Sequence, residues 1–445
     1  MDKEMIDAAK SIISDIRKAG FDCLVVGGAV RDIICGSTPK DIDLVTTAHP
    51  DELEKIFPDI RWAGRAFGVS LLKRGNHTFE LASARLERTY LDGRHPENIV
   101  FSRSFEDDVI RRDFTVNALL YDPFTGKITD YVNGIADAEK KLIRCVGEPE
   151  KRFSEDALRM LRAVRFASLR NFQLEEKSLS AIKELAHNVK MLAGERIKSE
   201  LDKILVSAQR RKALETMRET GLLKAVLPEV DALYGVRQEK KFHPEGDVFT
   251  HTCIMLDRMQ YPGTTLAWSV ILHDIGKAVT TFEDENHRIR AFGHEEKGAQ
   301  MVENIASRLK FSTAEKESIT AAVRNHMRMA NVRNMREAKL KRMMLDSNFP
   351  LELELHRLDC ISSHGIMDCY LFLLDNLASD ENIRNRELKA LVSGKELIGC
   401  GFTPSPLFKK VLDEIFDRQL AGEFKDKKSA LEAAVRVMDL LQHKQ

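Results

Sequence analysis

Short apolar runs separated by polar turns dominate the first 140 residues of the chain. The runs expected to form β-strands are Cys23–Val26, Ile42–Val45, Val69–Leu72 and Thr78–Leu81. Before them, apolar residues recur near helical spacing among charged ones, which predicts an amphipathic helix with Ile6, Ala9, Ile13 and Ile16 on one face. This part of the chain is therefore expected to be a mixed α/β domain with a small β-sheet.

The pattern changes to helical periodicity near Ser154 and keeps it almost to the end of the chain. The stretch SEDALRMLRAVRFASL places Leu158, Leu161, Val164 and Leu169 in one apolar stripe, with Ser154 as a candidate N-cap. A further amphipathic helix is expected over Leu407–Leu420. The predicted fold class is α+β, with the mixed α/β region followed by all-helical regions. The expected divisions are residues 1–140, 141–240, 241–375 and 376–445.

Charge and cysteine content narrow the class of protein. The 445 residues carry 69 basic and 69 acidic side chains, so net charge gives no argument for nucleic-acid binding. The segment Lys140–Arg218 nevertheless holds nineteen Lys and Arg against eleven Asp and Glu, which indicates either solvated helix faces or a path for an RNA backbone. Seven scattered cysteines without a Cys-x-x-Cys pair fit a cytoplasmic protein. No apolar run reaches eighteen residues, so no membrane partner is expected.

A first cluster of candidate functional residues lies in LVVGGAVRDIICGSTPKDIDLVT, Leu24–Thr46. A Gly-Gly pair between a strand and a helix lets the backbone approach a phosphate. Asp41 and Asp43 are two residues apart, so on a strand both face the same side and can share a pair of divalent ions. Glu80, on a later strand, can supply a third carboxylate. The alternative is that these acids are only the polar face of an edge strand and a surface glutamate.

Five motifs of this chain resemble those of one enzyme family. GGAVRD followed by DID is similar to the signature of class II tRNA nucleotidyltransferases and bacterial poly(A) polymerases. RRDFTVNALLYD (Arg111–Asp122) resembles the second motif of that family, and TDYVNGIADAEKKLIR (Thr129–Arg144) resembles its link between catalytic head and neck. EDALRMLRAVRF (Glu155–Phe166) is similar to the nucleotide-selecting helix, and ERIKSEL (Glu195–Leu201) to the neck helix beyond it. The motifs stand in the family order over the first half of the chain.

The resemblance implies a role for each matching residue. Asp41 and Asp43 would be the catalytic metal ligands, Glu80 the third acid, and Mg²⁺ the ion. The residues implied in nucleotide binding outside the neck are Gly27, Gly28, Arg31, Arg112, Asp113 and Asn117. The implied reaction is attack by an RNA 3′-hydroxyl on the α-phosphate of CTP or ATP with release of pyrophosphate. Expected partners are thus tRNA, ATP and CTP.

Three charged residues of the neck are candidates for choosing the base. Asp156, Arg159 and Arg162 are spaced i, i+3 and i+6, so on one helix they occupy an arc of about 120° and can face one pocket. A carboxylate and a guanidinium complement the pairing edge shared by cytosine and adenine, and leave guanine and uracil unpaired. An ordinary exposed ion pair is the alternative. In the family, a loop corresponding to Arg88–Phe101 helps switch the pocket from C to A, and Asp92–Arg94 resembles the version in A-adding enzymes.

A second cluster consists of histidines and aspartates in the helical half. ILHDIGKA contains His273-Asp274 and resembles the metal-binding core of HD-domain phosphohydrolases. The resemblance implies a divalent metal, of unknown identity, at His251, His273, Asp274 and Asp359, with His294 and His326 completing a second position. His356 and His364 flank Asp359 and compete for its role. Hydrolysis of phosphate esters at RNA ends and a purely structural HD fold are both open.

The function predicted from the sequence is template-independent addition of CCA to tRNA 3′ ends. An A-adding tRNA nucleotidyltransferase and a poly(A) polymerase share nearly all of these motifs and are the alternatives within the class. From a different class, the chain could be an HD metal phosphohydrolase whose N-terminal half only binds RNA. The paired carboxylates Asp41 and Asp43 argue against that hypothesis, because a binding module has no need of them.

Overall fold

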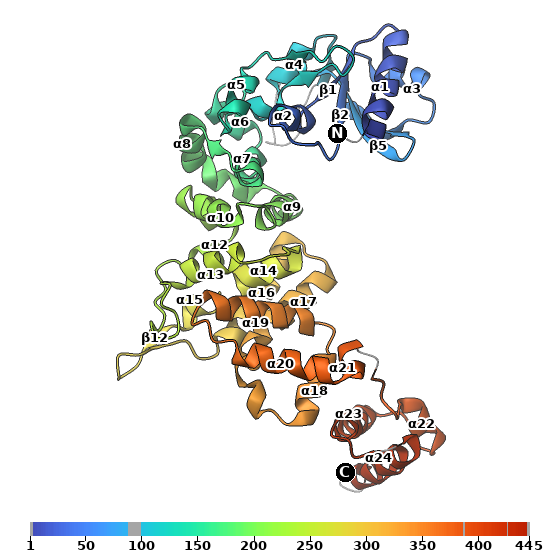
Figure 1. Ribbon diagram of the computed structural model, residues 1–445, viewed down its shortest axis with the longest axis vertical. Coiled ribbons are helices and arrows are strands. Elements are labelled where there is room, and N and C mark those ends of the chain that lie inside the picture. The colour runs from blue at the N-terminus through green and yellow to red at the C-terminus, as the bar shows by residue number, and fades with distance from the viewer. Residues whose placement is uncertain (1–2, 88–98, 386–387, 425, 443–445) are drawn as a thin grey trace. The chain divides into compact units, whose positions relative to one another are not determined.

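The computed structural model describes residues 3–87, 99–385, 388–424 and 426–442 (Figure 1). The chain divides into two compact units, Met1–Asp231 with Ser307–Phe311 and Ala232–Ala306 with Ser312–Gln445. The expected switching loop Arg88–Phe101, including Asp92–Arg94, lies outside the described residues except for its last three. No helix in the described part of the chain is both long and apolar enough to cross a membrane.

A seven-stranded mixed sheet forms the centre of the first unit. The strands lie in the order β3-β4-β5-β2-β1-β8-β9; β2 and β5 are parallel, and the other described pairs are antiparallel. The strands are β1 (Cys23–Val26), β2 (Asp43–Thr46), β3 (Arg61–Gly64), β4 (Val69–Arg74), β5 (His77–Ser83), β8 (Leu120–Tyr121) and β9 (Ile128–Thr129). A separate pair consists of β6 (Arg85–Glu87) and β7 (Ile99–Phe101). All four strands predicted from the sequence are present, with ends shifted by up to two residues.

Both faces of this sheet are buried, as the alternation of side chains along a strand requires. On one face, Val25 and Leu44 join a core with the helices α1 (Lys3–Lys18) and α3 (Pro50–Ile56). On the other face, Val26 and Val45 join a smaller core with residues of α4 (Phe105–Ile110) and the turns around it. The short helices α2 (Gly28–Ile34) and α5 (Gly134–Glu139) and the 3₁₀ turns η1 (Arg65–Phe67) and η2 (Thr115–Asn117) complete the head.

The helix α1 anchors the first of these cores. Its apolar stripe is confirmed, but with a shifted face, because Ile12 is fully buried and Ile6 only half-buried. We expect Ile13→Ala to lower the free energy of unfolding by about 2–5 kcal/mol, since it leaves a cavity beneath a side chain that is 0% exposed. Ser11→Ala, on the exposed face of the same helix, should change it by less than about 0.5 kcal/mol. Urea denaturation of both variants measures the difference.

A helical neck follows the head in the same unit. Its elements are α6 (Pro149–Glu155), α7 (Leu158–Arg170), α8 (Glu176–Leu185), η3 (Ala186–Met191), α9 (Gly194–Leu205), α10 (Arg210–Glu219), α11 (Leu222–Val226) and α12 (Pro228–Asp231), with the small parallel pair β10 (Leu142–Ile143) and β11 (Gln173–Leu174). The helix α7 packs on α9 and α10. Leu158, Leu161 and Val164 are buried as expected, but Leu169 is 39% exposed.

The expected single helix starting at Ser154 is wrong. The chain breaks it into α6 and α7, because Asp156 has an extended backbone (φ −147°, ψ 102°). Ser154 lies inside α6, where its hydroxyl donates to the carbonyl of Glu150, so it is not an N-cap. Instead, the Asp156 carboxylate accepts a hydrogen bond from the backbone N–H of Leu158 near the start of α7. An aspartate that satisfies a free N–H at a helix start favours such a break.

The second unit is almost entirely helical. Its helices are α13 (Val248–Asp257), α14 (Thr264–Leu272), α15 (Lys277–Thr280), α16 (His294–Leu309), α17 (Thr313–Asn325), η4 (His326–Asn334), α18 (Glu337–Leu345), α19 (Phe349–Ser362), α20 (Asp368–Ser379), α21 (Glu381–Asn385), α22 (Gly394–Gly399), α23 (Pro406–Leu420) and α24 (Lys427–Gln442). A short hairpin of β12 (Phe282–Glu283) and β13 (Ile289–Arg290) interrupts them. The helices α13, α14, α17 and α19 pack together, and α22–α24 share a core of their own. The predicted helix Leu407–Leu420 corresponds to α23.

Candidate catalytic edge and histidine centre

Three acidic side chains meet at one edge of the head sheet. Asp43 is the first residue of β2 and pairs with Val26 of β1, while Asp41 lies two residues before it. The register of the parallel pair β2–β5 sets Leu44 opposite Leu81, so Asp43 and Glu80 are neighbours across the two strands. All three carboxylates are exposed, and the buried residues between them face the core. The three acids therefore gather at one edge of the sheet, although Asp41 precedes the strand, and their role as metal ligands stays a prediction.

The electrostatics of this edge favour a cation. Partial burial and the negative charges of Glu80 and Asp41 raise the pKa of Asp43 to about 6, while Arg112 acts in the opposite direction. Carboxylates held this close repel one another, and a bound divalent cation would relieve that repulsion. The donor set of two or three carboxylate oxygens is the one that Mg²⁺ prefers. The residues present thus fit the expected metal.

The Gly-Gly turn keeps space open beside these acids. Gly27 has φ 81°, which favours glycine, and a Cβ there would lie 3.8 Å from Nη1 of Arg112 and 3.9 Å from Oδ2 of Asp43. The backbone of the turn, an arginine nitrogen and a catalytic carboxylate therefore border one small volume. Glycine at this position leaves that volume free for a ligand.

Arg112 is held in place by a buried aspartate that the sequence did not single out. The carboxylate of Asp108, which is 0% exposed, accepts hydrogen bonds from Nε and Nη2 of Arg112 at 3.0 and 2.8 Å and from Nε of Arg111 at 2.8 Å. Burial opposes the charge of Asp108, but Arg112 and Arg111 outweigh it and lower its pKa. The remaining nitrogen of Arg112, Nη1, is the one beside Gly27.

Arg31 has a different environment from the one expected of a triphosphate ligand. It is buried, its Nε and Nη2 donate to Asp32, and its Nη1 donates to Oδ1 of Asn117 at 2.7 Å. The guanidinium thus joins α2 to Asn117 of the second motif. The amide nitrogen of Asn117 is buried without a hydrogen-bond partner. A role of Arg31 in phosphate binding stays a prediction.

The three proposed base-reading residues each have a partner in the structure. Arg162 donates from Nε to Oδ2 of Asp113 at 2.8 Å, which joins the neck to the head. Although burial opposes it, the charge of Arg162 lowers the pKa of Asp113. Arg159 is buried and donates to the carbonyl of Arg152 and to the carboxylate of Glu155. Asp156 forms an ion pair of 3.1 Å with Arg196 of α9.

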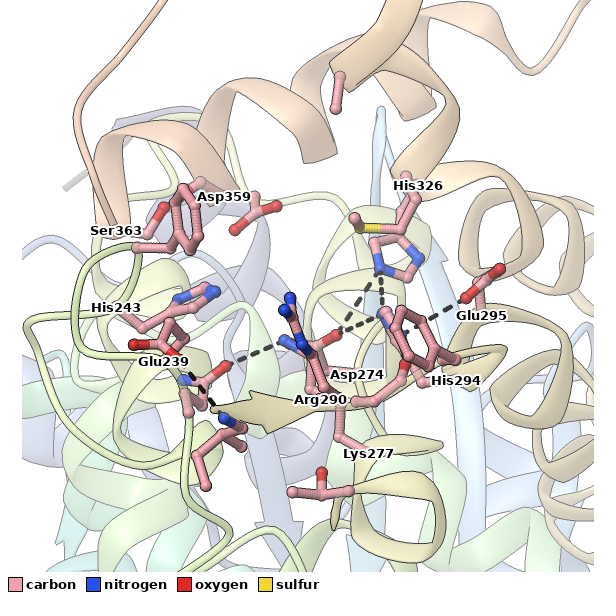
Figure 2. Close-up of a pocket in the computed structure, with 18 of the residues that line it drawn as sticks. Glu239, His243, Asp274, Lys277, Arg290, His294, Glu295, His326, Asp359 and Ser363 are labelled. Carbon is pink, nitrogen blue, oxygen red and sulfur yellow. Dashed lines mark hydrogen bonds and ion pairs between the residues drawn. The ribbon is translucent and has the colours of Figure 1, made fainter. Parts of the chain in front are cut away.

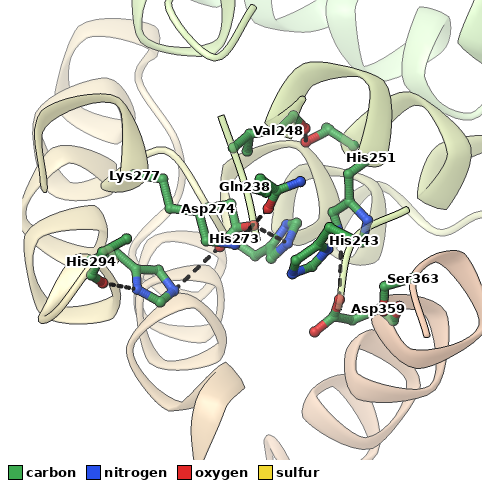
Figure 3. Close-up of polar contacts among 12 residues, drawn as sticks. Gln238, His243, Val248, His251, His273, Asp274, Lys277, His294, Asp359 and Ser363 are labelled. Atoms are coloured by element: carbon green, nitrogen blue, oxygen red, sulfur yellow. Dashed lines mark hydrogen bonds and ion pairs between the residues drawn. The ribbon is translucent and has the colours of Figure 1, made fainter. Parts of the chain in front are cut away.

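The six expected metal ligands of the second unit converge. His273, the residue after α14, lies 3.2 Å from Oδ2 of Asp274, measured from Nε2. On the other side, Oδ1 of Asp274 lies 3.3 Å from Nε2 of His294 and 3.6 Å from Nε2 of His326. Asp359 of α19 lies 3.1 Å from Nε2 of His251. Asp274 thus stands between two groups of histidines (Figures 2 and 3).

Backbone hydrogen bonds fix the ring orientation of three of these histidines. Nδ1 of His273, His294 and His326 each lies 2.7–2.8 Å from a backbone carbonyl, which can only accept, so Nδ1 carries the proton. In the neutral ring, Nε2 then presents a lone pair, as in a metal-ligating histidine. Nε2 of His294 and Nε2 of His326 are only 3.1 Å apart, so a proton or a cation must lie between them. Burial lowers the pKa of His326 to about 3, which leaves its ring neutral.

Two residues that the sequence did not single out, His243 and Glu245, lie beside His251. Oε1 of Glu245 lies 2.6 Å from Nδ1 of His251 and 3.0 Å from Nδ1 of His243. Burial alone would lower the pKa of His251, but its hydrogen bonds with Asp359 and Glu245 raise it to about 9. His243 and Glu245 lie in the turn-rich stretch KKFHPEGDVFTH, where only their proximity in sequence to His251 was a signal. Asp359, rather than His356 or His364, contacts His251.

The donor set of this centre fits a divalent metal. Among the described residues, three groups of ligand atoms lie within 4.8 Å of one another, namely His243, Glu245 and His251; His251, His273 and Asp274; and Asp274, His294 and His326. Nε2 of His273 and Oδ1 of Asp274 are buried and make no well-aligned hydrogen bond. Imidazole and carboxylate are suitable for Mn, Fe, Ni or Zn. The centre borders a cavity of about 580 Å³.

Three family models match successive parts of the chain. They are the "Poly A polymerase head domain" over residues 23–144, the "Probable RNA and SrmB-binding site of polymerase A" over 171–234 and the "HD domain" over 248–353. The acidic sheet edge lies in the first, and His251, His273, Asp274, His294 and His326 lie in the third. The fold and the two centres thus define a nucleotidyltransferase head, a neck and an HD domain.

Individual relatives narrow this class. The CCA-adding enzyme of Lactobacillus helveticus is 33% identical over 287 residues, which cover 62% of this chain and 67% of that protein. The CCA-adding enzyme of Levilactobacillus brevis is 29% identical over 97% of this chain and 98% of its own length. Matches to several others span 52–66% of those proteins. The structural alignment with the crystal structure of the Bacillus stearothermophilus CCA-adding enzyme in complex with CTP covers 100% of this chain and 100% of that chain. The identity is 25% and the TM-score is 0.74. The chain belongs to the CCA-adding enzyme family.

Proposed function

We propose that this chain completes tRNA 3′ ends by template-independent addition of C, C and A. CTP and ATP are the substrates and pyrophosphate is the product. The observation that carries the proposal is the acidic edge, where Asp41, Asp43 and Glu80 meet beside the Gly27 turn and Arg112. A protein that only bound RNA would gain nothing from clustering three carboxylates where the RNA backbone is repelled. Membership of the family supports the same activity.

The chain's own residues would bind and position the reactants. Asp41 and Asp43 would hold two Mg²⁺ ions, which, when bound, supply charge stabilisation for the attacking and leaving oxygens. Arg112, oriented by Asp108, directs Nη1 at the volume beside Gly27 and would bind the triphosphate. The amide nitrogen of Asn117, which has no hydrogen-bond partner, would donate to the nucleotide. Catalysis is then mainly positioning and charge stabilisation.

Asp156, Arg159 and Arg162 would select the base. Each already has a protein partner, so reading C or A means exchanging that partner for the pairing edge of the nucleotide. Asp156 accepts hydrogen bonds from the amino group that cytosine and adenine share, and Arg196 holds its carboxylate in place until then. The basic neck, Lys140–Arg218, would carry the tRNA backbone.

This proposal makes a prediction for Asp156→Asn. We expect the rate of CTP and ATP addition to fall about 100-fold, because an amide replaces a full acceptor, and UTP addition to become measurable beside it. Glu184→Gln, an exposed acid of the same neck, should leave both rates unchanged. Single-turnover addition with each of the four nucleotides measures the ratio. An unchanged CTP-to-UTP ratio would assign the choice of base to other residues.

A second activity is proposed for the HD domain, namely metal-dependent hydrolysis of phosphate esters at RNA ends. The convergence of buried ligand atoms supports this over a purely structural HD fold, since Nε2 of His273 and Oδ1 of Asp274 lie among other ligand atoms and make no well-aligned hydrogen bond. His251, His273, Asp274 and Asp359 would hold one metal, and His294 and His326 with Asp274 a second.

The first experiment uses three tRNA transcripts that end at the discriminator base, at CC and at CCA. Each is incubated with Mg²⁺ and CTP, ATP or both, and products are resolved at single-nucleotide resolution. Addition of C, C and A to the first transcript, followed by a stop, is the expected result. Extension only of the CC transcript by one A would identify an A-adding enzyme, and long A tails would identify a poly(A) polymerase.

We also propose the parts of the chain that carry these roles. Residues 1–140 would be the catalytic head, 141–240 the neck and body, 241–375 the HD domain and 376–445 a helical tail. All seven cysteines are free thiols, which supports a reducing cytoplasmic location.

A further inference from the structure

One buried arginine of the neck binds the backbone of the head. Arg152 belongs to α6 and is only 9% exposed, and an arginine is rarely buried to this degree unless its charge is paired. Its Nη2 donates to the backbone carbonyls of Arg111 and of Arg112, the latter at 2.9 Å. Its Nη1 donates to Oε2 of Glu155 at 2.5 Å. The guanidinium of Arg152 therefore joins a neck helix to two consecutive residues of the second motif.

The two carbonyls lie where α4 ends. Arg111 is the residue that follows the last turn of α4, and the last carbonyls of a helix have no partner within it. A charged donor makes stronger hydrogen bonds to such carbonyls than a neutral donor, and it fixes the backbone at that point. Asp108, in the same helix, binds the guanidinium of Arg112. The backbone of Arg112 and its side chain are thus held by two separate groups.

The same hydrogen bonds reach a residue proposed to read the base. Nη1 of Arg159 donates to Oε2 of Glu155 at 3.0 Å, so one carboxylate oxygen accepts from both Arg152 and Arg159. Nη2 of Arg159 also donates to the carbonyl of Arg111, at 3.3 Å. The side chains proposed for base reading and for triphosphate binding therefore share one set of hydrogen bonds, which spans head and neck within a single compact unit.

We propose that Arg152 is a positioning residue for nucleotide addition, which holds the backbone of Arg111 and Arg112 so that Nη1 of Arg112 faces the volume beside Gly27. The inference rests on the proposed function, in which Arg112 binds the triphosphate. Arg152 acts through Arg112 and not on the nucleotide, because both terminal nitrogens of its guanidinium bind protein oxygens. Loss of these bonds frees the backbone that carries Arg112, and a misplacement of about 1 Å near the reacting groups can lower a rate about 100-fold.

The test is a double-mutant cycle of Arg152→Met and Arg112→Met on the full chain. The single-turnover rate of ATP addition to the transcript ending at CC is measured at saturating ATP, together with the melting temperature of each variant. Each single variant is expected to lower the rate about 100-fold. Because both changes act through the same guanidinium, the double variant should be at most about threefold slower than Arg112→Met alone. Arg152→Lys keeps the charge and a donor for the carbonyls, so it should be about tenfold faster than Arg152→Met.

Arg17→Met is the matched control, because Arg17 of the same unit also donates to a backbone carbonyl, that of Cys23, and pairs with the carboxylate of Asp122. It should leave the rate unchanged. Losses that multiply in the double variant to about 10,000-fold would overturn the inference and leave the proposed function intact. A loss in Arg152→Met no greater than that in Arg17→Met would do the same.

The cycle also separates positioning from a loss of folded protein. A smaller folded fraction lowers the rate by the same factor whether or not Arg112 is present, so it produces multiplying losses. If Arg152→Met does not fold, Arg152→Lys takes its place in the cycle with the same criteria. Absence of nucleotide addition by the wild type would reject the proposed function and, with it, the inference.

Discussion

Replacing both Asp41 and Asp43 by alanine is expected to abolish CCA addition, with a loss of roughly 1,000-fold or more. The proposal assigns both metal ions to these two carboxylates, and among the described residues of the edge Glu80 alone would remain to hold them. Folding should be preserved, because both residues are exposed, and the substitutions remove the partly buried Asp43 carboxyl together with its repulsion from Asp41 and Glu80. Extension of the transcript ending at the discriminator base measures the loss.

The same variant tests whether the chain has two independent centres. Hydrolysis at the HD site should remain at the wild-type rate. Loss of both activities together would contradict the proposal of two independent centres. Asp59→Ala is a suitable control, because it removes an exposed acid of the same unit that lies outside the acidic edge. Undiminished CCA addition in the double variant would contradict the assignment of the catalytic acids.

The reciprocal prediction concerns Asp274→Asn in the HD domain. Asp274 stands between His273 on one side and His294 and His326 on the other, so its loss should remove both metal positions. We expect Mn²⁺ to be absent after dialysis, phosphate-ester hydrolysis to fall at least 100-fold, and CCA addition to be unchanged. Metal content and the rate of phosphate release measure the first two effects.

Stability provides a second readout of the metal centre. Mn²⁺ at 100 times its dissociation constant should stabilise the wild type by about 2.7 kcal/mol and leave Asp274→Asn unaffected. His287→Ala, which changes an exposed histidine of the hairpin turn, should retain the full effect. Equal stabilisation of wild type and Asp274→Asn would place the metal elsewhere, and a purely structural HD fold would then be favoured.

The sequence predicted local features of the molecule well where neighbours along the chain decide them. All four strands and the helix Leu407–Leu420 formed close to their expected places, because alternation and helical periodicity depend on short spacings. The sequence also placed Asp41 and Asp43 close together, but in the structure only Asp43 lies on the strand, and its neighbour Glu80 comes from the pairing of β2 with β5. The sequence did not predict that the helix breaks at Asp156, because the apolar stripe continues across the break. The break is visible in the hydrogen bond that the Asp156 carboxylate accepts from the N–H of Leu158.

Residues whose roles depend on distant partners were harder to predict. Asp108, buried beneath Arg111 and Arg112, and Glu245, beside His251, belong to no spacing pattern that stands out in the sequence. The hydrogen bond of Arg31 to Asn117, 86 residues further along the chain, was not expected from the sequence, and its role in phosphate binding stays a prediction. A hydrogen bond over such a separation depends on how the strands and helices pack, which no local pattern encodes.

By itself, the sequence determined the class of the protein, the order of its parts and the residue types of both centres. Catalytic chemistry restricts the choice of side chains and short spacings, and these remain visible in a linear chain. The tertiary structure alone decided which nitrogen of His273, His294 and His326 faces the metal position and which carboxylate orients Arg112. These properties arise from contacts between segments far apart in sequence, and packing of the whole domain is what brings those segments together.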